Sequence, residues 1–206
     1  MLVQWVVVLS IFIVSLVCHE VSHGWVAYRL GDPTAKALGR LSLNPLRHID
    51  WVGTVAIPWL LAVSHSPVVF GWAKPVPIDY RQLEHPKRDL IWVGLAGPAA
   101  NVALALLAAL ALRVARVPQD GTVWGAIGAT VVLVNLSLAC FNLIPIPPLD
   151  GSRVLVGLLP WPAARWVARV EPFGFLILIA LMYLGVINRF VWPLVGHAAR
   201  ALGVSW

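Results

Sequence analysis

His19, Glu20 and His23 are the residues of this sequence whose types and spacing are best suited to chemistry. Apart from a cysteine, a tyrosine and the amino terminus, they are the only ionisable groups between Met1 and Tyr28. Two histidines four residues apart project from the same face of a helix, one turn from each other. Two imidazole nitrogens so placed can bind one tetrahedral zinc ion, with the glutamate close enough to act on a water held by the zinc.

The depth of these groups in the apolar segment strengthens this interpretation. A helix over the first 28 residues would be about 42 Å long, enough to cross a hydrocarbon core of about 30 Å. His19 precedes Arg29, the first cation, by ten residues, or about 15 Å of helix. Because an acidic group there costs roughly 2.5–3.5 kcal/mol to insert, we expect Glu20 to face protein or water and to have a task. A chance H-E-x-x-H is common in soluble helices, and this cost argues against it here.

The composition is that of a polytopic membrane protein. Of 206 residues, 60% are hydrophobic and 12% charged, and the mean hydropathy is +0.83. No polar region is long enough for a separate soluble domain. The net charge of +6 lies in short loops, as the positive-inside rule expects, and does not indicate nucleic-acid binding. The first segment lacks a basic start and a signal cleavage site, so we expect a retained span. Cys18 and Cys140 lie in apolar segments and are expected to be buried free thiols.

The predicted fold class is an all-α polytopic membrane protein with about four to six transmembrane helices. Short β, extended or re-entrant segments are expected between the first and next clear spans. Alternation of polar and apolar residues predicts a short strand or hairpin arm at 34–44. A short interfacial stretch at 154–169 and an amphipathic tail at 190–206 complete the chain. Clear spans are predicted over residues 2–30, 90–112, 122–141 and 172–188.

The apolar run at 51–73 could cross the membrane or dip into it and return. If it dips, eleven Lys and Arg residues share one face and four lie on the other, which satisfies the positive-inside rule. The dip also puts Asp150 on the same side as the end of the first helix. We prefer it as a hypothesis.

Zinc needs a third protein ligand besides two histidines, and several residues could supply it. Asp150 is favoured because its carboxylate lies among apolar residues and prolines, with no cation closer in sequence than Arg153. An N-cap at the start of a helix would explain Asp150 equally well, so the residues alone leave both possibilities open. The candidates are His48, Asp50, His65, Asp79, His85 and Asp150.

The chain resembles the site-2 protease family of intramembrane zinc metalloproteases, specifically the small bacterial members without a PDZ domain. The resemblance rests first on His19-Glu20-Val21-Ser22-His23-Gly24 together with the later stretch Asn142 to Leu149-Asp150-Gly151. Asn44-Pro45 with His48-Ile49-Asp50, the run from Gly71 to Pro77, and Ala96-Gly97-Pro98 with Asn101 also match. It covers roughly residues 10 to 155.

The resemblance implies roles for the matching residues. His19, His23 and Asp150 would bind one zinc ion per chain, Glu20 would be the catalytic acid/base, and Asn142 would steady the substrate or the oxyanion. The reaction would be hydrolysis of a peptide bond in or near a transmembrane segment of a substrate protein, as in regulated intramembrane proteolysis.

The resemblance also implies an organisation. We expect one membrane-embedded metalloprotease domain over residues 1–206, with a catalytic core at about 2–155. The expected location is the bacterial cell membrane, with the active site nearer the cytoplasmic face. A substrate helix must unwind before it is cut, and the segments at 34–44 and 72–77 could accept it as an added strand.

Other readings compete with these. The same residues could serve a divalent-metal transporter or a non-catalytic metal-binding scaffold, but no repeated halves with broken helices are visible. His48 could contact the substrate or the water path, or it could be an interfacial histidine that caps a turn. Asn101 is expected to be a hydrogen-bonding contact between helices and not a site residue. Substrate identity and oligomeric state are not indicated.

Overall fold

The computed structural model describes residues 2–64, 74–118 and 121–204. Over these residues the chain is helical and contains no strand. The α-helices are α1 (Leu2–Arg29), α2 (Thr34–Ala37), α3 (Ile57–Val63), α4 (Pro86–Val114), α5 (Val123–Asn142), α6 (Asp150–Leu158), α7 (Trp161–Val170), α8 (Gly174–Tyr183) and α9 (Val186–Ala201). Shorter elements are the 3₁₀ turns η1 (Pro45–Arg47), η3 (Tyr80–Gln82) and η4 (Glu171–Phe173), and the π-helical turn η2 (Trp51–Ala56).

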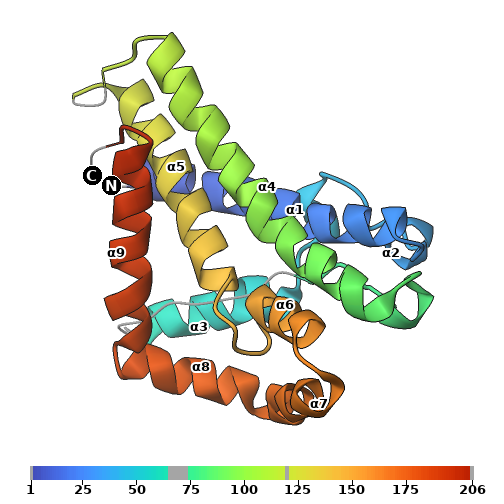
Figure 1. Ribbon diagram of the computed structural model, residues 1–206. Helices are drawn as coiled ribbons and strands as arrows, with labels where there is room; N and C mark the ends of the chain where they lie inside the picture. The colour runs from blue at the N-terminus through green and yellow to red at the C-terminus, as the bar shows by residue number, and fades with distance from the viewer. Residues whose placement is uncertain (1, 65–73, 119–120, 205–206) are drawn as a thin grey trace.

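Four stretches of the described chain are long and apolar enough to cross a membrane: Val3–Arg29, Pro86–Val114, Val123–Asn142 and Trp161–Tyr183. This confirms the predicted fold class, an all-α polytopic membrane protein. Helices α1, α4 and α5 pack against one another, and α4 crosses in front of α1 in Figure 1. The predicted spans at 2–30, 90–112 and 122–141 each correspond to one of these helices.

The segment after α1 is folded back along the end of that helix. Gly31 adopts a left-handed φ of 107°, which a glycine tolerates and which ends the helix. The Asp32 carboxylate is fully buried and accepts hydrogen bonds from the backbone N–H of Thr34 (2.9 Å) and of Asp79 (2.8 Å). Glu84 N–H also donates to Leu30 O at 3.0 Å. These contacts fix the polar segment 74–84 beside α1.

The strand predicted at 34–44 was wrong. Residues Thr34–Ala37 form α2, whose first residue follows Pro33, and residues 40–44 have no regular structure. The alternation was misleading because its apolar positions are used differently: Ala35 is fully buried, whereas Leu43 is exposed. The Arg40 side chain does not take part in a strand. Its guanidinium donates hydrogen bonds to Lys74 O (2.8 Å) and Pro75 O (3.3 Å).

The described residues that flank the run at 51–73 lie side by side. Asp50 caps η2 by accepting from Val52 N–H and Gly53 N–H at 3.0 and 2.7 Å. Residues 65–73 lie outside the described part of the chain, but the two flanks are joined: Lys74 N–H donates to His48 O at 2.9 Å. A segment whose ends are hydrogen-bonded returns to its starting face, so this contact supports the predicted dip.

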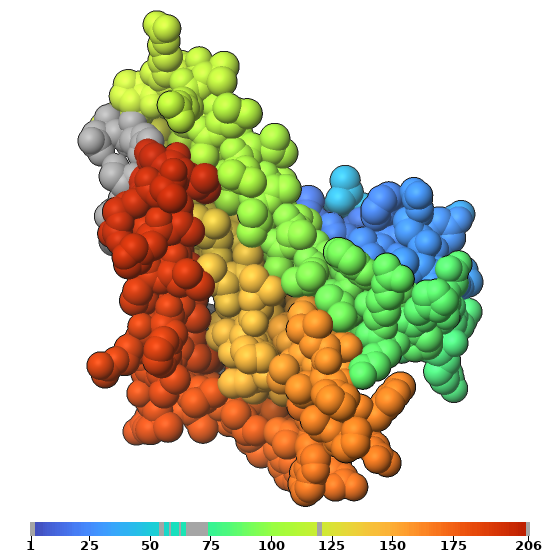
Figure 2. Space-filling view, in the orientation of Figure 1, coloured from blue at the N-terminus to red at the C-terminus, as the bar shows by residue number. Residues whose placement is uncertain are grey.

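The carboxyl-terminal third departs from the prediction. The helix expected over 172–188 is divided, because Leu184 and Gly185, with a left-handed φ of 70°, separate α8 from α9. Most of the amphipathic tail expected at 190–206 is helical: residues 190–201 belong to α9, which packs along α5. In Figure 2, α5 is seen between α4 and α9. The apolar core there contains Ala105, Ala109, Val132, Leu136, Val195, Ala199 and Val204.

Candidate metal centre

Three ligand atoms from two distant parts of the chain meet in the interior. His19 Nε2 lies 3.0 Å from His23 Nε2, and Asp150 Oδ2 lies 3.0 Å from the first and 3.1 Å from the second. The three residues are 2%, 3% and 5% exposed, respectively. Among the described residues, they form the one group of three or more His, Cys, Asp or Glu side chains with ligand atoms this close.

The other nitrogen of each imidazole is already engaged. His19 Nδ1 donates to Asn101 Oδ1 at 2.6 Å, and His23 Nδ1 donates to Val93 O at 2.6 Å. A main-chain carbonyl can only accept, so the proton of His23 is on Nδ1. With both protons on Nδ1, each neutral ring presents the unprotonated Nε2 to the centre.

This donor set fits a zinc ion. Two unprotonated nitrogens and a carboxylate oxygen are all hydrogen-bond acceptors, and three acceptors about 3 Å apart repel one another unless a cation lies among them. Two imidazoles and one carboxylate, with a further position left open, are the ligands of catalytic zinc sites. Hydrogen bonds from the distal ring nitrogens to a carbonyl or amide oxygen are typical of zinc-binding histidines.

Asp150 reaches the centre from the first turn of α6. It was predicted either as a ligand or as an N-cap, and its side chain makes no cap: Leu149 occupies the N-cap position. Its other oxygen, Oδ1, accepts from Arg153 Nη1 at 3.0 Å, which leaves Oδ2 directed at the histidines. Gly151 allows this turn to pack tightly, because an added Cβ would collide with Leu143 O.

Helix α4 closes the centre on the opposite side. At Gly97 a methyl group would lie 2.5 Å from His19 Nε2 and closer still to His23 Nε2. Only a glycine at this position lets the backbone of α4 approach the two imidazoles. Gly97, one of the small residues predicted to permit close helix approach, therefore faces the two imidazoles.

Glu20 lies beside the three ligands and is not one of them. Its Oε2 accepts from Val76 N–H at 3.0 Å, a contact with the extended segment 74–79. No partner for Oε1 is found in the described parts of the chain. Because a backbone N–H holds one oxygen, the carboxylate is fixed at the edge of the centre with one oxygen left to exchange a proton.

A cavity of about 420 Å³ opens onto the centre and contains the remaining predicted site residue. Asn142, at the end of α5, lines it and donates from Nδ2 to Leu138 O at 2.9 Å. Its Oδ1 has no partner among the described residues. The apolar wall of the cavity includes Phe12, Leu16, Val76, Ile78, Leu138 and Phe141.

The other candidate ligands lie elsewhere. His48 is buried, yet it does not line the cavity; its Nε2 contacts Ser42 O at 2.8 Å. Asp79 is paired with Arg81 at 3.0 Å, and hydrogen bonds from the Arg81 side chain and backbone lower the pKa of Asp79 to about 2. Asp50 caps η2, and His85 precedes α4. His65 falls outside the described residues.

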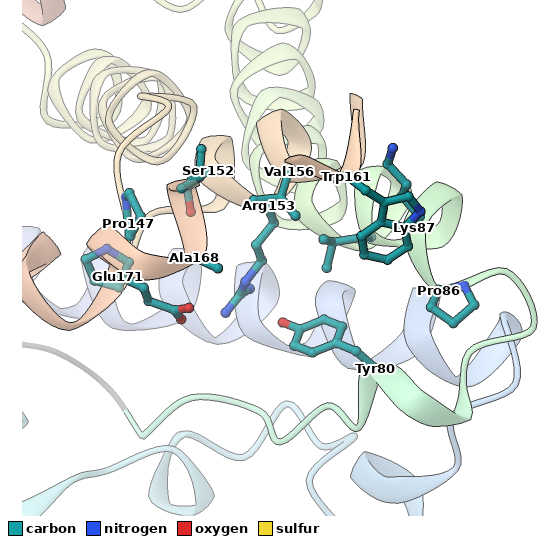
Figure 3. A pocket seen from close by; sticks show the side chains of 13 residues that line it. Tyr80, Pro86, Lys87, Pro147, Ser152, Arg153, Val156, Trp161, Ala168 and Glu171 are labelled. Atoms are coloured by element: carbon teal, nitrogen blue, oxygen red, sulfur yellow. The ribbon is translucent and has the colours of Figure 1, made fainter. Parts of the chain in front are cut away.

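A second cavity of about 370 Å³ lies next to the first and shares Pro148 and Arg153 with it. Figure 3 shows Arg153 directed between Tyr80 and Glu171. The guanidinium carbon lies 6.0 Å from the centre of the Tyr80 ring, and burial raises the pKa of the Tyr80 hydroxyl. Arg153 thus forms part of the wall between the two cavities while it holds Asp150.

Sequence reasoning missed the second layer of the centre. Asn101 was expected to be only a contact between helices, but it accepts the proton of a metal-facing histidine. The available signal was its position: an amide four residues after Gly97 lies on the same face of the helix. The Val93 carbonyl leaves no signal in the sequence at all.

Comparison with known proteins agrees with this geometry. The sequence profile described as "Peptidase family M50" matches residues 117–185. YwhC of Bacillus subtilis, named "Putative zinc metalloprotease YwhC", is 34% identical over an alignment of 195 residues that covers 88% of this chain and 82% of YwhC. The chain belongs to peptidase family M50, the site-2 protease family.

Further relatives carry similar names. The "Putative zinc metalloprotease Rip2" of Mycolicibacterium smegmatis is 31% identical over 202 residues, covering 98% of this chain and 76% of Rip2. Rip2 of Mycobacterium tuberculosis is 30% identical over 201 residues, with the same coverage. No solved structure matches the chain.

Family membership confirms the predicted class of activity and cofactor. This M50 peptidase is a zinc metalloendopeptidase that acts within the membrane. It is a multi-pass membrane protein, and its family acts on membrane proteins in the lipid bilayer. The transporter alternative is not favoured.

Proposed function

We propose that His19, His23 and Asp150 bind the catalytic zinc, that Glu20 is the acid/base, and that Asn142 contacts the substrate. One observation carries this proposal: three acceptor atoms meet within 3.1 Å in the interior, while both distal imidazole nitrogens donate elsewhere. An arrangement of this kind is stable only around a cation.

The residues divide the work of peptide hydrolysis. A bound zinc lowers the pKa of a coordinated water toward about 7 and polarises the peptide carbonyl. Glu20 takes the proton from the attacking water and later gives it to the leaving amine. The Val76 N–H keeps the carboxylate in reach for both transfers. Asn142 has an amide oxygen free within the cavity and can accept a hydrogen bond from the substrate backbone.

The substrate segment must be unwound to reach the cavity, since a helix shields its own peptide groups. Of the two segments predicted to pair with it, residues 34–37 are helical. In the other segment, residues 75 and 77 are prolines, so residues 74–77 have two backbone N–H groups. The N–H of Lys74 donates to His48 O, and the N–H of Val76 donates to Glu20. A substrate strand there would find carbonyl oxygens but no free N–H group to pair with. We therefore propose that the peptide is held mainly by the walls of the cavity and not by pairing as an added strand.

We also propose an orientation and a division of the chain. Eleven of the fifteen Lys and Arg residues fall within 29–88 and 153–169. The dip proposed for residues 51–73 puts these segments on one face, which supports a site nearer the cytoplasmic face of the cell membrane. All proposed site residues lie between positions 19 and 150, which supports a catalytic core at about 2–155. The remainder supports that core, since α9 packs on α5.

The test compares zinc binding and peptide cleavage in reconstituted membranes. Glu20→Gln should bind zinc as the unmodified protein does and fail to cut a membrane-helix substrate. Asp150→Ala and His23→Ala should lose zinc and cleavage together. Equal cutting by Glu20→Gln, or full zinc binding by Asp150→Ala, would contradict the assignment.

A further inference from the structure

A chain of hydrogen bonds leads from His19 into α5. Asn101 accepts from His19 Nδ1, and its own Nδ2 donates to Asn135 Oδ1 at 2.8 Å and, more weakly, to Ser15 O at 3.3 Å. Asn135 Nδ2 donates in turn to Ser15 Oγ and to Val131 O, both at 2.9 Å. The chain thus joins α1, α4 and α5 beneath the metal centre.

The direction of the bonds in this chain follows from its last member, Val131 O, and the longer contact of Asn101 Nδ2 with Ser15 O favours the same direction. Val131 O is a main-chain carbonyl and can only accept, so the NH₂ group of Asn135 must face it. The oxygen of Asn135 therefore faces Asn101 and attracts the NH₂ group of that amide. Asn101 is left with its oxygen toward His19, which places the histidine proton on Nδ1.

The opposite orientation of Asn101 would disable the ligand. An NH₂ group facing His19 Nδ1 would need that nitrogen to accept, and the ring proton would move to Nε2. The lone pair that faces His23 and Asp150 would then be lost. Both asparagines are 0% exposed, so bulk water cannot replace the missing partner. An exposed amide would not be constrained in this way.

We propose that Asn135 is a positioning residue for the metal centre: acting through Asn101, it keeps the metal-facing nitrogen of His19 free of its proton. This inference rests on the proposed role of His19 as a zinc ligand. A pair of asparagines that only joined helices would stabilise the fold without affecting how tightly the centre holds a cation.

The experiment measures zinc affinity by competition with a chelator, together with thermal unfolding of the zinc-free protein, in detergent-purified full-length protein. Removing a hydrogen-bonding partner of a metal ligand typically weakens metal binding 10- to 100-fold. We expect about a 100-fold loss for Asn101→Leu and about a tenfold loss for Asn135→Leu. If Asn135→Leu is not monodisperse, Asn135→Ala removes the same oxygen without added bulk and takes its place.

The double variant separates positioning from stability. Asn135 is proposed to act on His19 only through its hydrogen bond with Asn101, so its loss should matter little once Asn101 is gone. The double variant Asn101→Leu/Asn135→Leu should therefore bind zinc within about threefold of Asn101→Leu alone. Thr130→Val is the matched control: it also alters α5, but its hydroxyl bonds only to Ala126 O of its own helix at 2.7 Å, and zinc affinity should not change.

Two results would overturn the inference. One is an Asn135→Leu protein that unfolds at a lower temperature but binds zinc normally. The other is a double variant whose losses of affinity simply multiply. His19→Ala is measured beside them: if it binds zinc normally, the proposed ligand set fails, whereas a loss in His19→Ala with none in Asn135→Leu contradicts the relay alone.

Discussion

The metal end and the apolar end of the α4–α5 pair are built on one continuous face but packed in different ways. Along α4, Gly97, Asn101, Ala105 and Ala109 follow one another at intervals of four residues and are all buried. The first two contact the histidines and their hydrogen-bond partners, whereas the last two pack against Val132, Leu136 and α9. Small residues bring the helices close at both ends. The fully buried polar side chains of this helix pair, Asn101 and Asn135, lie toward the metal end.

This contrast shows how a membrane enzyme can keep its centre rigid. At the apolar end, contact area alone holds the helices, and any side chain of the right size would serve. At the metal end the distal imidazole nitrogens and the amides of Asn101 and Asn135 each have an assigned partner, so a substitution there changes chemistry as well as packing. The predictions below test whether the two ends respond separately.

Removal of zinc should have the largest effect, and only at the metal end. At a zinc concentration 1,000 times its dissociation constant, the bound ion stabilises the protein by about 4 kcal/mol. Chelation should remove this stabilisation and leave three facing acceptors. Hydrogen exchange should then increase in α1 near His19 and in the first turn of α6, but not around Val132. Equal increases at both ends would mean that the ends unfold as one unit.

Gly97→Ala should nearly abolish zinc binding. The added methyl group would lie 2.5 Å from His19 Nε2, and neither the α4 backbone nor the two ligands can move away easily. We expect about a 100-fold or greater loss of affinity. Gly128→Ala is the control in the same helix pair, since its methyl group would meet only the flexible Leu112 side chain at 2.6–2.8 Å. Zinc competition on both variants checks the difference.

Arg153→Gln should weaken zinc binding by about tenfold, because Asp150 would lose the hydrogen bond that turns Oδ2 toward the histidines. Arg165→Gln, in α7 and outside both cavities, serves as the control and should bind zinc normally. The measurement is the same chelator competition. Unchanged affinity in Arg153→Gln would show that packing alone orients Asp150.

Val132→Ala should act only at the apolar end. Val132 is 0% exposed, and deleting the equivalent of two CH₂ groups from such a site costs about 2 kcal/mol of unfolding free energy. Zinc affinity of the folded protein should be unchanged, which distinguishes this variant from Asn135→Leu one turn away on the same helix. Denaturant unfolding and zinc competition on one preparation would check both statements.

Much of this molecule could be predicted from its sequence, and the failures have physical causes. The apolar helices and the histidine pair follow from periodicity and spacing, which are local properties. Asp150 could be favoured because a lone carboxylate among prolines needs a partner, but nothing local chose between a ligand and an N-cap. The role of Asn101 depends on α1 and α5 meeting α4, a tertiary fact. The strand or hairpin arm predicted at 34–44 failed because alternation does not say what a face packs against.

The contact between Val76 N–H and Glu20 has a consequence for anyone who scans this enzyme by substitution. The group that holds Glu20, the proposed acid/base, belongs to the main chain, so replacing Val76 by alanine leaves it in place. A proline would delete it, whereas a survey of side chains would miss the contribution of the main chain. The same holds for Val93, whose carbonyl fixes the proton of His23. Part of the catalytic apparatus is therefore hidden from alanine scanning and visible only to changes of the backbone.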